Sequence, residues 1–310
     1  MKIVYGLEEK NFELWRNLIT IGNFDGIHRG HSIILKRLLG LANETGRKSI
    51  VVTFKPLPKM FLRKSNFKLI TTLDEKFQIM EDYGIDGVCV LPFTERFSKI
   101  EPQEFLKKLW EYFHPEGIVV GYNHRFGRDG KGGVSLLEDF SREKDIELIV
   151  VKEVRVGDTT VCSSRIRVLI SNGEIGRANE MLGRNFFFSG TVCRGNGVGK
   201  SLSFPTANLK IDSPQKILPE EGVYAARVSV NGANFGAMLY LGKKPTFYES
   251  ADSICELYIM EFNENLYGKK LKVEVLKRIR EDKKFNSAHK LKEQLSRDEE
   301  TARKIFCNML

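Results

Sequence analysis

The chain has 310 residues, which is long for a single hydrophobic core, so we expect two domains. Hydrophobic residues make up 42% and charged residues 29%, as in soluble globular proteins, and a net charge of +9 suits nucleotides, RNA or an acidic membrane surface without choosing among them. The five cysteines are an odd number with no Cys-x-x-Cys pair, which argues against a disulfide framework or a zinc site and favours the reducing cytoplasm. No stretch is long and apolar enough to span a membrane, which argues against a membrane protein.

The first half alternates short apolar runs with amphipathic helical patterns, the order typical of a parallel sheet with crossover helices. The expected strands are 19–22, 49–54, 87–91, 117–121 and 147–151, and the expected helices are 31–44, 73–83, 102–113 and 134–143. This order predicts a doubly wound, Rossmann-like α/β domain, which binds nucleotides where its first strand ends.

The first strand leads directly into the segment Gly22-Asn23-Phe24-Asp25-Gly26-Ile27-His28-Arg29-Gly30-His31. Its glycines let the backbone approach a ligand, and His28 and His31 lie three residues apart at a helix N-terminus. Backbone N–H groups, the helix dipole and two imidazoles would then surround one phosphate. The alternative is a pair of surface histidines in a turn.

The His-x-Gly-His pattern resembles the signature of the nucleotidyltransferase superfamily. The full segment resembles the FMN adenylyltransferase half of the bacterial bifunctional riboflavin kinase/FAD synthetase family. This resemblance implies that Gly22, Asn23, Phe24, Asp25 and Gly30 bind ATP and that His28 and His31 are catalytic.

A second glycine-rich and basic loop, 121–133, follows a strand end and could close over a polyanion. It resembles the family's Val-Gly-x-Asp-Phe-x-Phe-Gly segment, with Asn123 in place of the usual Asp and His124 in place of the usual Phe. The resemblance implies that Asn123 and Arg125 bind ATP. As structure alone, the loop would be a flexible surface turn.

The segment Val161-Cys162-Ser163-Ser164-Arg165-Ile166-Arg167 begins a helical pattern in which hydroxyls can cap backbone N–H groups and guanidiniums can bind phosphate. It resembles the family's Ile-Ser-Ser-Thr-x-x-Arg motif, which implies that Ser163 and Ser164 bind ATP and that Arg167 is catalytic. The alternative is a capped helix with a basic first turn.

Beyond a short helical connection at 164–183, the pattern changes to strands without intervening helices, followed by a helix. The expected strands are 189–193, 206–209, 223–230, 234–241, 253–262 and 271–280, and the helix is 287–306. We predict a small antiparallel β-barrel with a C-terminal helix, and domains at 1–183 and 184–310. Phe186, Phe187 and Phe188 would be core or pocket wall.

The loop Gly195-Asn196-Gly197-Val198-Gly199-Lys200 lacks the spacing of a P-loop. Together with Pro205-Thr206-Ala207-Asn208 it resembles the riboflavin kinase signature. The resemblance implies that Gly195, Gly197, Gly199 and Lys200 bind ATP, and that Thr206 and Asn208 supply oxygens to Mg²⁺. A proline turn entering a strand is the structural alternative.

Glu256 matches the catalytic glutamate of the riboflavin kinases. A carboxylate beside a primary hydroxyl can accept its proton while a phosphoryl group is transferred. Without the resemblance, a solvent-facing strand residue would be the preferred interpretation.

The two sets of motifs predict a bifunctional enzyme that phosphorylates riboflavin to FMN and adenylylates FMN to FAD, with ATP and Mg²⁺ in use and no nucleic acid or membrane partner. The alternatives are a chain with only one active half and a basic RNA-binding module with a degenerate nucleotidyltransferase domain.

Overall fold

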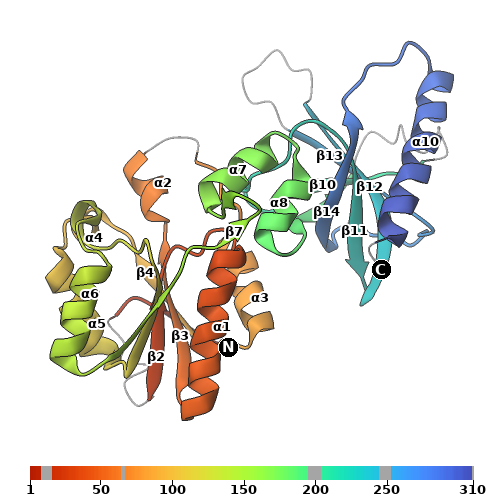
Figure 1. Cartoon of the computed structure of the whole chain (residues 1–310). Coiled ribbons are helices and arrows are strands. Elements are labelled where there is room, and N and C mark those ends of the chain that lie inside the picture. The colour runs from red at the N-terminus through yellow and green to blue at the C-terminus, as the bar shows by residue number, and fades with distance from the viewer. Residues whose placement is uncertain (8–15, 64–66, 195–203, 244–252, 309–310) are drawn as a thin grey trace. The chain divides into compact units, whose positions relative to one another are not determined.

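The computed structural model describes residues 1–7, 16–63, 67–194, 204–243 and 253–308. Contacts divide the chain into two compact units, Met1–Ser163 and Ser164–Leu310 (Figure 1). The assignment of catalytic domains to 1–183 and 184–310 stays a prediction. Among the described residues, the structure contains no helix with the length and apolar character needed to cross a membrane.

The first unit is built on a six-stranded, fully parallel sheet. Its strands, in spatial order, are β1 (Lys2–Tyr5), β4 (Gly87–Pro92), β3 (Lys48–Lys55), β2 (Asn17–Ile21), β5 (Gly117–Gly121) and β6 (Glu147–Val151). The doubly wound fold predicted from the sequence is confirmed. Edge strand β1 was not predicted, because only Val4 of its four residues is buried.

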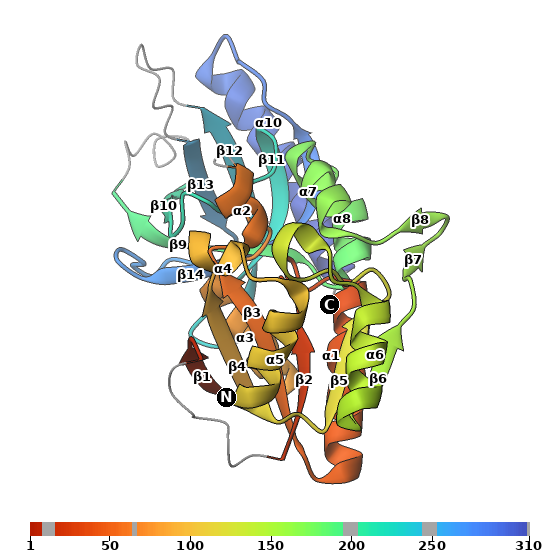
Figure 2. The same ribbon diagram turned by 90° about the vertical axis from the view of Figure 1, so that its left-hand side faces the viewer.

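Helices cover both faces of this sheet (Figures 1 and 2). Helices α1 (Arg29–Thr45) and α3 (Leu73–Tyr83) lie on one face, and α5 (Pro102–Phe113) and α6 (Val134–Lys144) lie on the other. The short helices α2 (Pro58–Arg63) and α4 (Glu95–Ser98), the 3₁₀ turn η1 (Arg128–Gly130) and the hairpin of β7 (Arg155–Val156) and β8 (Thr159–Thr160) were not predicted.

The strand order places the topological switch point between β2 and β5. These two strands are hydrogen-bonded neighbours, while the chain continues from β2 toward β3 and β4 on one side and from β5 toward β6 on the other. In open α/β sheets, ligands bind beyond the carboxyl ends of the two strands at this point. The loops that follow Ile21 and Gly121 are therefore the expected ligand-binding loops of this unit.

The predicted connection at 164–183 consists of two helices that belong to the second unit. Helix α7 (Ser163–Ser171) starts at the boundary, and Gly173, with φ of 71°, separates it from α8 (Ile175–Leu182). Asn179 on α8 accepts a 2.7 Å hydrogen bond from the Phe186 N–H and donates one of 3.0 Å to the Val275 carbonyl. This amide ties α8 to the barrel.

The second unit contains the predicted barrel, which is closed and antiparallel. Its strands, in spatial order, are β10 (Ala207–Ile211), β13 (Ser253–Ile259), β12 (Ala233–Lys243), β11 (Gly222–Val230), β14 (Lys270–Glu281) and β9 (Phe186–Cys193). Phe186, Phe187 and Phe188 are buried.

The final helix, α10 (Ala288–Cys307), is capped by Ser287 and packs on the outside of the barrel. Its Ala302 side chain joins a buried cluster with Ala225, Met238 and Leu276, and Leu295 packs against the same cluster. The apolar stripe predicted from the sequence therefore covers strands β11, β12 and β14.

Candidate active sites

The loop between β2 and α1 has an unusual backbone. Three of its residues have positive φ: Phe24 at 46°, Gly26 at 88° and Ile27 at 37°. Bulky residues rarely adopt such angles, so the surroundings must hold this conformation. At Gly22, a Cβ atom would lie only 3.0 Å from the Phe24 ring. The sequence Gly-x-Phe-x-Gly thus suits a tightly folded turn.

Hydrogen bonds fix the carbonyl groups of this loop. The Asn23 carbonyl accepts from the Lys76 ammonium at 2.7 Å, the Phe24 carbonyl from the Ile27 N–H at 3.3 Å, and the Asp25 carbonyl from the Ser163 hydroxyl at 2.8 Å. A phosphate site needs its backbone N–H groups directed toward the ligand and its carbonyls held elsewhere. The bonded carbonyls of this loop meet the second requirement.

The Asp25 carboxylate also holds the loop. It is buried, and its Oδ1 atom accepts hydrogen bonds from the N–H groups of Ile70 at 3.0 Å and Thr71 at 3.1 Å. The Thr71 hydroxyl in turn accepts from the Gly26 N–H at 2.9 Å. Asp25 therefore joins the loop to the segment that precedes α3.

His28 and His31 lie together where α1 begins. His28 is the N-cap residue, with its Nδ1 atom 3.4 Å from the His31 backbone nitrogen that donates to it. The two imidazole rings are stacked with centroids 3.8 Å apart, and the Phe24 ring lies 5.1 Å from that of His31. The predicted pairing of two imidazoles with a helix N-terminus is present, and the helix starts two residues earlier than predicted.

The two predicted serines lie on either side of the unit boundary. Ser163 is the first residue of α7 and reaches the Asp25 carbonyl. Ser164 and Arg167 follow on α7 within the second unit. Their roles at the ATP phosphates stay predictions.

The loop after β5 is closely built. Phe126 and Gly132 exchange backbone hydrogen bonds of 3.1 and 3.0 Å, and the Arg128 N–H donates to the Ile100 carbonyl at 2.7 Å. A Cβ atom at Gly132 would lie 2.6 Å from the Phe126 ring. These contacts argue for a formed loop at the switch point rather than the flexible turn considered from the sequence.

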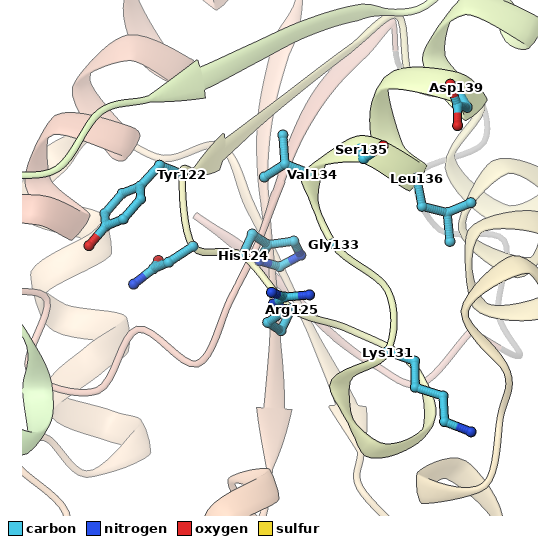
Figure 3. Close-up of a pocket in the computed structure, with 10 residues that line it drawn as sticks. Tyr122, His124, Arg125, Lys131, Gly133, Val134, Ser135, Leu136 and Asp139 are labelled. Carbon is cyan, nitrogen blue, oxygen red and sulfur yellow. The ribbon is translucent and has the colours of Figure 1, made fainter.

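A cavity of about 790 Å³ lies between this loop and the start of α6 (Figure 3). It is lined on one side by Asn123, His124 and Arg125 and on the other by Val134, Ser135 and neighbouring residues of α6. In Figure 3, His124, Arg125 and Gly133 lie together at its centre. The guanidinium of Arg125 and the N-terminus of α6 bring positive charge to this cavity.

His124 is neutral at physiological pH. Burial lowers the pKa of its imidazole to about 4. Its Nε2 atom is buried and has no hydrogen-bond partner among the residues that the structure describes, and its ring stacks on the Phe126 ring with centroids 5.6 Å apart. The imidazole therefore acts as an aromatic wall of the cavity rather than as a cation.

The barrel brings together the predicted kinase residues that the structure describes. Glu256 on β13 is directly opposite Asn208 on β10, and its Oε2 atom accepts a 3.2 Å hydrogen bond from the Thr206 hydroxyl. The other cross-strand neighbour of Glu256 is Tyr240 on β12. Burial, with the Asp282 and Glu256 carboxylates nearby, raises the pKa of Tyr240 to about 12. The predicted ATP-binding residues Gly195, Gly197, Gly199 and Lys200 lie outside the described residues.

Two family models match the chain, one on each half. The model described as FAD synthetase matches residues 12–165, and the model described as riboflavin kinase matches residues 182–306. A curated relative from Bacillus subtilis, named bifunctional riboflavin kinase/FMN adenylyltransferase, is 32% identical, with 95% of this chain and 94% of the relative aligned. The chain belongs to this family.

A further curated relative and a solved structure are similar to the chain over nearly its whole length. The relative of this name from Listeria monocytogenes is 31% identical, with 100% of this chain and 99% of the relative aligned. A crystal structure from Streptococcus pneumoniae, described as that of a macrolide-efflux protein, is 29% identical and has a TM-score of 0.89, with 98% of this chain and 99% of that chain covered. The solved structure thus shares the fold of this chain over nearly its whole length.

Two residues of these sites were not predicted from the sequence. Tyr240 becomes a neighbour of Glu256 only through strand pairing. Lys76 lies on the buried face of α3 with Ile79 and Met80, and its side chain reaches the loop between β2 and α1. The sequence did contain a signal for Lys76, because this lysine occupies a position at which the helical spacing of Ile79 and Met80 predicts an apolar residue.

Proposed function

We propose that this chain makes FAD from riboflavin in two ATP-dependent steps, each at its own site. In the first, riboflavin and ATP give FMN and ADP. In the second, FMN and ATP give FAD and pyrophosphate. The observation that carries the proposal is the presence in one chain of two formed sites, the stacked His28–His31 pair at a helix N-terminus and the Thr206–Glu256 pair on the barrel.

Glu256 is the general base of the kinase step. The 5′-hydroxyl of riboflavin gives its proton to the carboxylate, its oxygen forms a bond to the γ-phosphorus of ATP, and the bond from that phosphorus to ADP breaks. The Thr206 hydroxyl, at 3.2 Å, holds Oε2 of Glu256 in place. The loop at 195–200 supplies the ATP-binding groups.

Thr206 and Asn208 would hold Mg²⁺ with the ATP phosphates. Hydroxyl and amide oxygens are hard ligands of the kind that this ion accepts, and Mg²⁺ keeps few protein ligands when phosphates share its coordination. Within the described ranges, no group of three or more His, Cys, Asp and Glu side chains is placed to hold a metal. The bound ion would neutralise charge on the transferred phosphoryl group.

The adenylyl transfer needs positioning and charge stabilisation more than a base, because the FMN phosphate is already an anion. Its oxygen attacks the α-phosphorus of ATP and pyrophosphate leaves. We assign the ATP phosphates to the loop of Gly22, Asn23, Phe24, Asp25 and Gly30. His28, His31 and Arg167 would stabilise the charge that develops on the phosphates and on pyrophosphate.

The remaining adenylyltransferase residues supply binding rather than chemistry. Asn123 and Arg125 would bind ATP from the cavity after β5, and Ser163 and Ser164 from the start of α7. Asp25 contributes through the loop, because its Oδ1 atom is already bonded to two backbone N–H groups.

We assign the protein to the cytoplasm, in line with its five free cysteines.

A time course with riboflavin, ATP and Mg²⁺, followed by chromatography of the flavins, tests the proposal. We expect FMN to rise first and FAD to follow, and omission of Mg²⁺ to stop FMN formation. FMN without FAD, also after FMN is supplied, would leave a kinase with a silent first unit. No product from either flavin would contradict both steps and favour the RNA-binding alternative, which salt-dependent binding in the absence of ATP would then support.

A further inference from the structure

A buried lysine supports the loop that carries His28 and His31. Lys76 is only 2% exposed, and its ammonium donates hydrogen bonds to the Asn23 carbonyl at 2.7 Å and to the Thr53 hydroxyl at 3.4 Å. The same Thr53 hydroxyl lies 3.4 Å from the Asn23 carbonyl. One cation thus connects α3, β3 and the loop after β2.

A lysine at this place is costly for the fold. Transfer of an ammonium group from water to a protein interior carries a large desolvation penalty, and an apolar side chain would suit the stripe that Lys76 shares with Ile79 and Met80. Asp25 is the charged group whose field favours the ammonium form, and the neighbouring Glu75 is engaged with the Thr72 N–H at 2.9 Å. The penalty calls for a role that an apolar residue cannot perform.

That role follows from the geometry of the peptide that Lys76 holds. The C=O and N–H groups of a trans peptide point in opposite directions, so a fixed Asn23 carbonyl also fixes the direction of the Phe24 N–H. Phe24 is the first of the three positive-φ residues of the loop, and its ring lies against His31. Release of the Asn23 carbonyl would therefore disturb both the backbone of the loop and the stacking around the histidines.

We propose that Lys76 is a positioning residue for adenylyl transfer, whose ammonium group holds the loop at 22–28 in the shape that binds the ATP phosphates. This inference rests on the proposed function. Lys76 touches no reacting atom in this assignment and acts through Asn23. Because burial lowers the pKa of Lys76 to about 8, the ammonium loses its proton within a range in which the enzyme can be assayed.

The full-length variants Lys76→Met and Lys76→Gln test the proposal. Methionine is similar in length to the aliphatic part of the lysine side chain but has no charge and no hydrogen-bond donor. Glutamine has a hydrogen-bond donor but no charge. Lys107→Met, on the exposed face of α5, is the matched control. Formation of FAD from supplied FMN is measured from pH 6.5 to 9.5, and formation of FMN from riboflavin by the same molecules reports on the intact second unit. Thermal unfolding shows whether the first unit of each variant is folded at the assay temperature.

We expect Lys76→Met to lower kcat for FAD formation about 10- to 100-fold at pH 7, as for a misplacement of about 1 Å at an active site. The wild type should lose FAD formation as the pH rises through about 8, and Lys76→Met should lack this decline. FMN formation and the Lys107→Met variant should match the wild type. If Lys76→Met is unfolded, the folded Lys76→Gln variant takes its place with the same expectations and a smaller loss.

Wild-type kcat and an unchanged pH profile in a folded Lys76 variant would overturn the proposal. A wild type that makes no FAD at any pH would instead refute the proposed function of the first unit, so the two failures are distinguishable.

Discussion

The hydroxyl of Thr206, the residue directly before β10, donates a hydrogen bond of 3.2 Å to Oε2 of Glu256 on β13. The contact places a carboxylate, a hydroxyl and the amide of the register partner Asn208 next to one another. In the proposed kinase step, Glu256 would be the general base, and Thr206 and Asn208 would be oxygen ligands for a hard cation.

The first prediction concerns Glu256. Glu256→Gln keeps the shape of the side chain and can still accept from Thr206, but it can no longer take a proton. We expect FMN formation from riboflavin to fall about 10²- to 10⁴-fold, the usual contribution of a general base. Formation of FAD from supplied FMN should be unchanged, and Glu264→Gln, on the surface of the same unit, should retain both activities. A Glu256→Gln variant with full kinase activity would refute the assignment.

The second prediction separates two roles of His28. The side chain caps α1 through Nδ1, and we assign its imidazole to the ATP phosphates. His28→Asn keeps a capping acceptor, whereas His28→Ala loses it at a cost of about 1 kcal/mol in the free energy of unfolding. Both variants should lose about 10²-fold or more of FAD formation, the effect of one missing charge-stabilising group, and both should retain FMN formation. Normal FAD formation by His28→Asn would show that the residue is only a cap.

Much of this architecture follows from local sequence. The helix at 102–113 was predicted with its observed bounds because Pro102 favours the first helical position and Phe105, Leu106 and Leu109 form one buried face. Likewise, the three-residue spacing of His28 and His31 brings the two side chains together when a helix starts between them. Contacts between distant segments could not be derived in this way. Lys76 is 53 residues from Asn23, and only the packing of α3 on the sheet brings the two together.

The third prediction concerns pH and His124. The pKa of this imidazole is lowered to about 4 in the folded protein, below its ordinary value of 6.5, so the unfolded chain binds the extra proton first as the pH falls. The contribution of His124 to the free energy of unfolding of the first unit should therefore be complete above about pH 6.5, and it should decrease as the pH falls toward 4. The decrease should amount to at most about 3 kcal/mol.

His124→Phe provides the matched comparison for this pH effect. Phenylalanine preserves the stacking on Phe126 and removes the titrating group. Denaturant unfolding between pH 4 and 8 should show a weaker pH dependence for the variant than for the wild type. Parallel curves for the two proteins would mean that the imidazole is protonated as easily in the folded protein as in the unfolded chain.

The last prediction concerns the attachment of α10 to the barrel. Asp298 is 1% exposed, and its two oxygens accept hydrogen bonds of 2.8 Å from Arg280 Nε on β14 and Gln294 Nε2 on α10. Asp298→Ala leaves the half-buried Arg280 guanidinium without this carboxylate. Loss of one partner of a buried ion pair should lower the free energy of unfolding of the second unit by about 3–5 kcal/mol.

An exposed ion pair on the same helix is the control for Asp298. Lys304 and Glu300 are 2.7 Å apart with both side chains exposed, so Glu300→Ala should change the free energy of unfolding by about 0.5 kcal/mol or less. Denaturant unfolding of the full chain, followed by kinase activity, measures both variants. Equal destabilisation by the two would show that burial of the Arg280–Asp298 pair does not set its contribution, whereas a selective loss in Asp298→Ala would identify this pair as the anchor of the C-terminal helix.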